Sequence, residues 1–542
     1  MTVPRVASTS SAATRLEIAL IAAVCAALCI VLGWTSRTAL NPDGVSYLDI
    51  AARLSAGDWS GAVQGYWSPL YPLLLAVLGT VTGATGTTLL VQVHFLNVGI
   101  ALGIVALLWR LARAHGDPIV ARALFAAFLL ASARTPRLDA VTPDLLLIGA
   151  VLGLGGELLR GAGSRWYALG SWFGVIFLTK TSSWPWLLVT VTLLTIAGDR
   201  AMRRTLVRAG GVALVVMALW VVPLSLKSGR PTLGSAGAFN ACWYLERCDS
   251  RTPDEHSGAH ARYGGLRLAD GELVTVADFS NTQWTYAPWS DPTAWQAEVG
   301  SINRAPLDLF DLVGYWSRQG WAVVSLWTPQ LLLFVLFPVA LLSWSRGLLA
   351  RGWREHRMAV LLVVLGLAGV AQFIVVHAEP RLIAPFVLLT SMGCLWWWRA
   401  PGIATSARPF RSEVVLVLSW VGLVSAVLRG AIYVPELMKR ATEDTARFER
   451  LRRAGDAAVP GGLAGRAVVV VGPAIPVVSD AWLFGARIVA QIPPGSAARI
   501  RNWTPAQQRE MLGLLGQGDG DVAWMTATNG SILMAPIVRS TP

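Results

Sequence analysis

The sequence predicts an α-helical polytopic membrane protein that carries a small α/β domain at its C-terminal end. Two features of the composition predict it: 54% of the 542 residues are hydrophobic and only 14% are charged, and the mean hydropathy is +0.53, well above that of an ordinary soluble domain. The formal net charge of +13 lies in short basic clusters between apolar runs. Cytoplasmic loops of membrane proteins show this distribution, so nucleic acid is not expected as a partner.

Apolar runs that can cross a bilayer as helices, which takes about 20 residues each, recur up to residue 434. We expect about eleven spans in a multi-pass protein of the cell (inner or plasma) membrane. No small-residue cleavage site follows the first run, so a retained first helix and a cytoplasmic N-terminus are expected. The candidate spans are residues 16–35, 88–110, 119–134, 142–160, 166–180, 182–198, 209–227, 321–344, 358–377, 382–398 and 412–434.

The apolar run 66–82 decides the topology. If it does not cross, the basic clusters near residues 110–122, 160–165, 200–208, 346–357 and 399–411 all fall on the cytoplasmic side, as the positive-inside rule requires. If it does cross, the strongest clusters fall on the wrong face. We therefore predict that 66–82 is an interfacial or re-entrant helix within an external loop of about residues 36–87. Pro69 and Pro72 near its start suit a helix that begins at headgroup level.

Two soluble parts are expected outside the membrane. One is a loop of about residues 228–320, and the other is an extracytoplasmic α/β domain, residues 435–542, after the membrane domain 1–434. In the tail, "RAVVVVG", "ARIVAQIP" and "DVAWMTAT" predict strands. "TPAQQREMLGLLGQG" predicts a helix that opens on Thr504 and Gln507 as a capping box. "VVGPAIP" lacks the spaced glycines of a nucleotide site.

Two of the five cysteines, Cys242 and Cys248, lie in the 228–320 loop. They could form a disulfide if that loop faces an oxidising compartment. The sequence leaves the paired and the unpaired state equally open.

The first ionisable residues at the predicted external face lie in "NPDGVSYLDIA". Asn41 can cap a helix, Pro42 suits its first position, and Asp43 then lies in the first turn, where the helix dipole favours a carboxylate. Tyr47 is four residues later, on the same face. Asp43 can serve as a functional acid or only help to begin the helix.

Three further external turns carry charge. "RTPRLDAVTPDLLLIG" contributes Arg137, Asp139 and Asp144, although Asp144 could be only a first-turn acid. "FLTKTSSWPW" contributes Lys180, which could also be a lysine that snorkels to the interface. The remaining residues come from "VVHAEPRLIAPF" and are His377, Glu379 and Arg381.

Carboxylates and cations thus meet in one plane, each delivered by a different helix. An Arg–Glu pair could merely close its own turn. Taken together, the groups suit a lipid-linked anionic substrate whose phosphate binds Arg and Lys while a carboxylate carries a proton. Asp49 and Asp58, farther along the first loop, are expected to be solvated surface acids.

The order of "NPDGVSYLDIA", "YWSPLYPLLLA", "RLDAVTPDLLL", "LTKTSSWPW" and "HAEPRLIAPF" resembles the GT-C superfamily of polytopic glycosyltransferases over about residues 1–434. The resemblance is to the bacterial relatives of the protein O-mannosyltransferases and of the lipid A aminoarabinose transferase. It implies a polyprenyl-phosphate sugar donor and a "PLY" helix that lies along the membrane. It also implies that Asp43 is the general base, that Asp144 is a second acid that shapes the pocket, and that Lys180 and Arg381 lie near the donor phosphate.

The sequence departs from these families in two places. It has "PDGVSY" instead of the paired Asp-Glu of the O-mannosyltransferases, and "EPRLIAPF" where many relatives have Arg-Tyr. A peptide acceptor and the family's metal are therefore not implied. No cofactor is required, and a divalent metal stays an open alternative.

The resulting hypothesis is an inverting glycosyltransferase that moves a sugar from a polyprenyl-phosphate donor to a hydroxyl of a glycan, lipid or protein acceptor at the external membrane face. A transporter or flippase of lipid-linked sugars is the alternative, but it would place charged or broken helices near the middle of the membrane. An inactive scaffold that binds partners through its tail is a third possibility.

Overall fold

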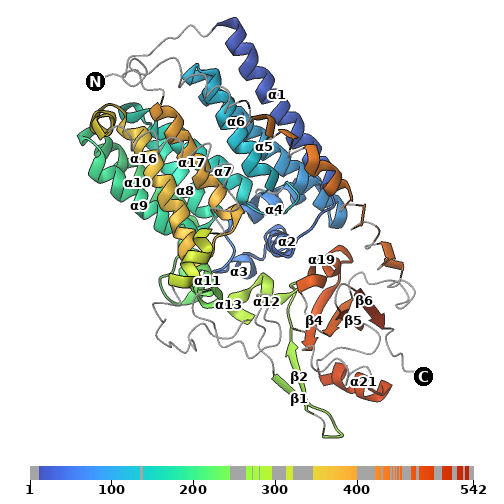
Figure 1. Cartoon of the computed structure of the whole chain (residues 1–542). Helices are drawn as coiled ribbons and strands as arrows, with labels where there is room; N and C mark the ends of the chain where they lie inside the picture. The colour runs from blue at the N-terminus through green and yellow to red at the C-terminus, as the bar shows by residue number, and fades with distance from the viewer. Residues whose placement is uncertain are drawn as a thin grey trace.

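The structure is a computed structural model in which a helical bundle adjoins a layer of short helices and a six-stranded sheet at one of its ends (Figure 1). It describes residues 11–134, 138–244, 264–271, 273–279, 281–295, 313–321, 346–398, 466–471, 475–492, 503–514, 522–528 and 531–535, together with parts of 420–453.

The bundle helices coincide with most of the predicted spans. They are α1 (Ala12–Thr35), α5 (Gly86–His115), α6 (Pro118–Arg134), α7 (Asp144–Leu158), α8 (Trp166–Thr179), α9 (Trp184–Ala197), α10 (Arg200–Ser228), α16 (Arg346–Val376) and α17 (Pro380–Trp398). Candidate span 321–344 lies almost entirely outside the described residues, as does much of 412–434.

Four described helices are long and apolar enough to cross a membrane: α1, α5, α10 and the Arg357–Val375 part of α16. Most of the other bundle helices are shorter apolar helices that pack among them. The chain is therefore a polytopic membrane protein, while the number of eleven spans stays a prediction.

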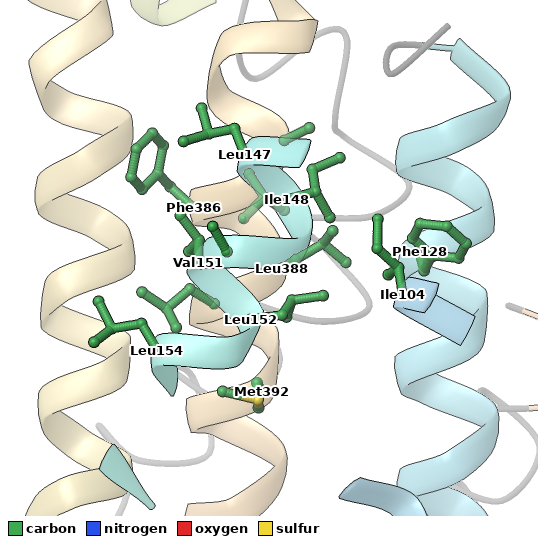
Figure 2. Packing of buried hydrophobic residues seen from close by; sticks show 14 of the residues in the cluster. Ile104, Phe128, Leu147, Ile148, Val151, Leu152, Leu154, Phe386, Leu388 and Met392 are labelled. Atoms are coloured by element: carbon green, nitrogen blue, oxygen red, sulfur yellow. The ribbon is translucent and has the colours of Figure 1, made fainter. Parts of the chain in front are cut away.

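The core of the bundle lies around α7, which is apolar on every side and buried along most of its length. Its leucine, isoleucine and valine side chains pack against α17, α5 and α6 (Figure 2). Helices α16 and α17 approach each other closely at Gly366 and Gly369. A Cβ at Gly366 would overlap the Thr390 hydroxyl, and one at Gly369 would overlap the Phe386 ring, so only glycine permits this approach.

Ion pairs join the helix ends at the far end of the bundle from the sheet. Arg357 Nη2 lies 2.7 Å from Asp199 Oδ2, and Arg122 Nε lies 2.6 Å from Glu17 Oε1. Arg122 and Arg357, from two of the predicted cytoplasmic clusters, thus lie at this end of the bundle, whereas the cluster near residues 399–411 lies outside the described residues. That this end of the bundle faces the cytoplasm stays a prediction.

At the other end, α1 is followed by α2 (Pro42–Ser55), α3 (Trp59–Ala62) and α4 (Leu70–Thr82). Helix α4 has 13 residues and extends about 20 Å. The Ser68 hydroxyl just before α4 lies 3.3 Å from that of Thr181, and α5 begins shortly after α4 ends. Because both ends of α4 lie at this end of the bundle, the structure agrees with a non-crossing run 66–82.

The sheet has the order β1-β2-β4-β3-β5-β6. Its strands are β1 (Gly264–Arg267), β2 (Leu273–Asp278), β3 (Ala467–Val471), β4 (Arg487–Ile492), β5 (Val522–Thr528) and β6 (Ser531–Ala535), with helices α19 (Ile475–Leu483) and α21 (Pro505–Leu514). The three predicted strands are β3, β4 and β5. The predicted capping box opens α21, where the Thr504 amide donates to Gln507 Oε1 at 2.9 Å and the Gln507 amide to Thr504 Oγ1 at 3.3 Å.

The sheet does not belong to the tail alone. Strand β2, from the 228–320 loop, pairs antiparallel with β4, while β3 pairs parallel with both β4 and β5. Helix α19 packs on α2 in a shared apolar cluster. The sheet therefore joins the loop to the tail and rests against the first loop.

The same loop contributes α11 (Ala236–Tyr244), α12 (Ala287–Ser290) and α13 (Pro292–Trp295). The possible Cys242–Cys248 bridge lies outside the described residues, because Cys248 is not among them. Cys25, Cys29 and Cys394 are free and buried.

Candidate active site

A cavity of about 530 Å³ lies where α2, α7 and α17 begin and where the turn before α9 meets the end of α16. It brings together seven of the predicted site residues, which are Asp43, Tyr47, Asp144, Lys180, His377, Glu379 and Arg381. Asp139 is not among its lining residues. The Asp139 carboxylate instead lies 3.5 Å from the Tyr433 hydroxyl, and Arg137 lies outside the described residues.

Asp43 occupies the first turn of α2, as predicted, with Pro42 at the first helical position. Asn41 occupies the N-cap position of α2, as predicted, but its side chain makes no capping hydrogen bond. Its Oδ1 accepts the Val141 N–H at 3.0 Å instead, and this bond joins the Asp43 loop to the Asp144 loop. Asp43 Oδ2 accepts a 2.7 Å bond from Arg381 Nη1.

The turn between α16 and α17 supplies a linked set of charges. Arg381 Nε donates to Glu379 Oε2 at 2.5 Å, and His377 Nε2 lies 3.3 Å from Glu379 Oε1. Burial opposes ionisation of Glu379, but the hydrogen bond from His377 and the charge of Arg381 outweigh it and hold the pKa of Glu379 well below its usual range. Glu379 is therefore a fixed anion that orients Arg381.

Asp144 and Lys180 form the second ion pair. Lys180 Nζ lies 3.0 Å from Asp144 Oδ1, and the Thr142 hydroxyl donates to Asp144 Oδ2 at 3.0 Å. Both residues line the cavity, but Asp144 is 1% exposed and Lys180 20%, so the ammonium is the more accessible member of the pair. The Lys180 turn is held on its other side by Gln372, whose Nε2 donates to the Ser182 carbonyl at 2.8 Å.

Tyr47 contributes a neutral hydroxyl. Burial and then the charges of Asp43 and Asp144 raise the pKa of the Tyr47 phenol well above its usual value. Its ring makes edge contacts with Trp67 and Tyr71 at centroid distances of 5.0 and 5.4 Å. The phenol therefore keeps its proton and can donate to an anion.

The three carboxylates of the cavity differ in how many of their oxygens can still accept a hydrogen bond or a proton. Both oxygens of Asp144 and both oxygens of Glu379 already have partners. Asp43 uses Oδ2 only, and no hydrogen bond from the described residues reaches its Oδ1. Asp43 is thus the carboxylate of this cavity with an oxygen available to take a proton.

Two cations retain unused donors. Arg381 uses Nε and Nη1, which leaves Nη2, and Lys180 uses one of its three N–H groups within the described part of the chain. Guanidinium and ammonium groups both bind phosphate oxygens. The cavity therefore combines a proton acceptor with a site for a phosphate.

No group of three or more His, Cys, Asp or Glu side chains in the described part of the chain is placed to hold a metal ion. The carboxylates at the cavity are paired with Arg381 and Lys180 instead.

The expectation that Asp49 is a solvated acid is wrong. Asp49 is 9% exposed and accepts hydrogen bonds from the Thr285 amide, the Thr285 hydroxyl and the Ser290 hydroxyl at 2.8–2.9 Å. Asp58 remains a surface acid, which caps α3 and pairs with Arg53 at 2.7 Å. Asp49 was missed because the loop that covers it is far away in the sequence.

Other lining residues were also missed, and among them are Trp67, Asn240, Trp289 and Gln372. Gln372 gave a signal, since it is an amide in an otherwise apolar run near its external end. Trp67 donates its indole N–H to the Trp289 carbonyl at 2.9 Å. Through this contact the 228–320 loop reaches the rim of the cavity.

Comparison with known proteins gives a structural likeness only. No protein-family profile and no curated protein matches the sequence. The apo structure of ArnT from Cupriavidus metallidurans superposes with a TM-score of 0.51 at 13% identity, over 95% of this chain and 94% of that one. The structure of the same protein bound to undecaprenyl phosphate gives 0.49 at 13% identity, over 94% and 93%. The predicted resemblance is thus confirmed at the level of the fold, since the chain has the fold of ArnT.

Proposed function

We propose that the protein is an inverting glycosyltransferase that moves a sugar from a polyprenyl-phosphate donor to a hydroxyl acceptor at the external membrane face. The observation that carries this proposal is the state of Asp43. It is the cavity carboxylate with an oxygen left to accept a proton, and it lies beside two cations with unused donors.

The reaction is a single displacement. The acceptor oxygen bonds to the anomeric carbon of the sugar while its proton passes to Asp43 Oδ1. The bond between that carbon and the phosphate oxygen breaks, and its electron pair leaves with the polyprenyl phosphate. Attack and departure occur on opposite faces of the sugar ring, so the configuration at the anomeric carbon inverts.

The cations act on the leaving group. Arg381 Nη2 and the Lys180 ammonium can bind the phosphate oxygens as charge builds up there, and the Tyr47 hydroxyl can add a further hydrogen bond. Asp144 and Glu379 keep Lys180 and Arg381 in place. That ArnT has been solved with undecaprenyl phosphate supports a lipid phosphate as the ligand of this fold.

Mass spectrometry of cells that lack the protein tests the proposal. A polyprenyl-phosphate-linked sugar should accumulate, and the wild-type gene should remove it. Asp43→Asn keeps the shape and an acceptor for Arg381 but removes the base, so transfer should fall by roughly 10²–10⁴. Asp58→Asn changes an acid of the same loop that does not line the cavity and should behave like wild type.

Reconstituted vesicles separate transfer from transport. A transferase releases free polyprenyl phosphate when acceptor is present, whereas a flippase moves the intact donor and releases none. Normal activity of folded Asp43→Asn, or movement of donor without release of polyprenyl phosphate, would contradict the proposal.

A further inference from the structure

Part of the cavity lining carries no charged side chain. Its described residues come from the segment just before α4, from α11 and from α12, so that the first loop and the 228–320 loop meet here. The charged lining residues come instead from α2, α7, the turn before α9 and the turn between α16 and α17. We call the first set the uncharged wall, which consists of Tyr66, Trp67, Ser68, Ala236, Gly237, Asn240 and Trp289.

The aromatic side chains of the uncharged wall contact one another. The ring centroid of Trp67 lies 4.8 Å from that of Tyr66 and 5.9 Å from that of Trp289, in edge-to-face geometry. The Ser235 amide, just before α11, donates to the Gly65 carbonyl at 2.7 Å. Together with the bond from the Trp67 indole to the Trp289 carbonyl, these contacts join three separate segments of the chain. The protein's own contacts therefore hold the wall in place.

The uncharged wall leaves ring and amide groups accessible from the cavity. Tyr66, Asn240 and Trp289 are half-buried, whereas Trp67 is 8% exposed and supports them. Asn240 Oδ1 lies 3.5 Å from the Tyr66 hydroxyl, and no hydrogen bond within the described residues uses Asn240 Nδ2. The faces of aromatic rings are partly negative and attract the partly positive C–H groups of a sugar ring, while an amide N–H binds a sugar hydroxyl. Such a surface suits a sugar ring without charge.

An amine on the sugar would find no carboxylate to pair with. Asp144 and Glu379 have partners at both oxygens, and in the proposed reaction Asp43 Oδ1 takes the proton of the acceptor. These three are the carboxylates of the described cavity lining. A protonated amine would therefore enter the cavity with its charge unpaired, which is costly away from bulk water.

A carboxyl group on the sugar would likewise lack a cation. Arg381 Nη2 and the Lys180 ammonium are assigned to the phosphate oxygens, and His377 is paired with Glu379 at 3.3 Å. The described lining contains no further lysine, arginine or histidine. A sugar carboxylate would therefore compete with the phosphate for the same donors.

We propose that the uncharged wall binds the transferred sugar, and that this sugar is neutral, with neither a free amine nor a carboxyl group. The inference rests on the proposed function, because it takes Asp43 as the base and assigns the two cations to the phosphate. It adds the class of sugar and the residues that hold it. Trp289 and Tyr66 contact the C–H groups of the sugar, and Asn240 donates to a hydroxyl.

Mass spectrometry of the polyprenyl-phosphate-linked sugar that accumulates in cells lacking the protein tests the class of sugar. Its accurate mass and fragmentation, with and without reagents that label amines or carboxyl groups, should show neither group. A free amine or a carboxyl group on that sugar would overturn this inference but leave the proposed glycosyl transfer standing. If no such lipid accumulates, the proposed function itself is contradicted, and this inference falls with it.

Binding of two lipids to the full chain in detergent separates the uncharged wall from the phosphate site. Trp289→Leu removes the ring but stays apolar, so it should weaken binding of the sugar lipid purified from those cells by roughly tenfold. Binding of undecaprenyl phosphate, which has no sugar, should not change, and this also shows that the variant is folded. Trp289→Phe keeps a ring and should recover most of the loss.

Two control variants complete the measurement. Trp166→Leu changes an exposed tryptophan at the other end of α8 from the cavity and should bind both lipids like the wild type. Arg381→Ala should weaken binding of both lipids, because both carry the phosphate. Equal losses for the two lipids in Trp289→Leu, or no loss for either, would overturn the assignment of the wall to the sugar.

Discussion

The buried carboxylate of Asp49 should make the loop that covers the site sensitive to pH. Burial raises the pKa of Asp49 from 3.8 to about 6, although the hydrogen bonds from Thr285 and Ser290 oppose the rise. Since each pKa unit corresponds to about 1.4 kcal/mol, ionisation of Asp49 costs the closed loop about 3 kcal/mol.

The sign follows from which form the folded state prefers. Because the pKa of Asp49 is higher in the folded state, the stabilisation is fully present below pH 3.8 and is lost as the pH rises through about 6. Opening of the segment that contains Thr285 and Ser290 should therefore become about a hundredfold more frequent between pH 4 and pH 7. In Asp49→Asn the amide oxygen can still accept the Thr285 N–H, and the opening should not depend on pH in this range.

Hydrogen exchange of peptides covering residues 281–295 measures this opening, after correction for the intrinsic effect of pH on exchange. Peptides from α8, which is far from Asp49 in the chain and carries no carboxylate, serve as the internal control. Two outcomes would refute the reasoning: an unchanged opening frequency in the wild type, or the same pH dependence in Asp49→Asn.

Three further predictions concern the site and the bundle. Arg381→Ala should weaken binding of undecaprenyl phosphate by roughly tenfold or more, which is the usual effect of losing a hydrogen bond to a charged group. Titrations measure the affinity for lipid and for acceptor separately. A larger loss of affinity for the acceptor than for the lipid would contradict the role assigned to Arg381. Lys180→Met keeps the length of the side chain but leaves Asp144 buried without its cation, so it should lower the free energy of unfolding by roughly 3 kcal/mol or more. The double variant Lys180→Met with Asp144→Asn should recover part of this loss. Gly366→Ala should destabilise the α16–α17 contact by about 1–3 kcal/mol, while Gly103→Ala, where a Cβ meets open space, should not; equal melting temperatures for both would argue against the close packing.

Local patterns predicted most of the described helices and the strands of the tail because these elements depend on nearby residues. The apolar runs gave the bundle helices, and the start at Thr504 gave α21 with its capping bonds. The partnership of β2 with β4 could not be predicted, because β2 is short and the strand it joins lies more than 200 residues later. Neither segment contains a local sequence pattern that indicates a strand partner at such a distance in the chain.

Charge placement predicted the site better than any single motif. Asp43 and Arg381 are 338 positions apart in the chain and meet at 2.7 Å, yet both were expected at one face because the basic clusters assign the other face to the cytoplasm. Asp49 was misjudged by the same reasoning. Topology says which face a residue occupies, but not which distant loop covers it.

The distribution of charge along α7 bears on the choice between transfer and transport. Asp144 begins this helix at the cavity, and Glu157 near its other end pairs with Arg165 at 3.0 Å. The residues between them, 145–156, include no charged side chain and pack against α5, α6 and α17. A path for a sugar phosphate along α7 would need polar groups over this length, about 20 Å. The ion pairs of α7 instead stop at its two ends, which is the arrangement expected if the lipid phosphate reacts at one face and leaves from it.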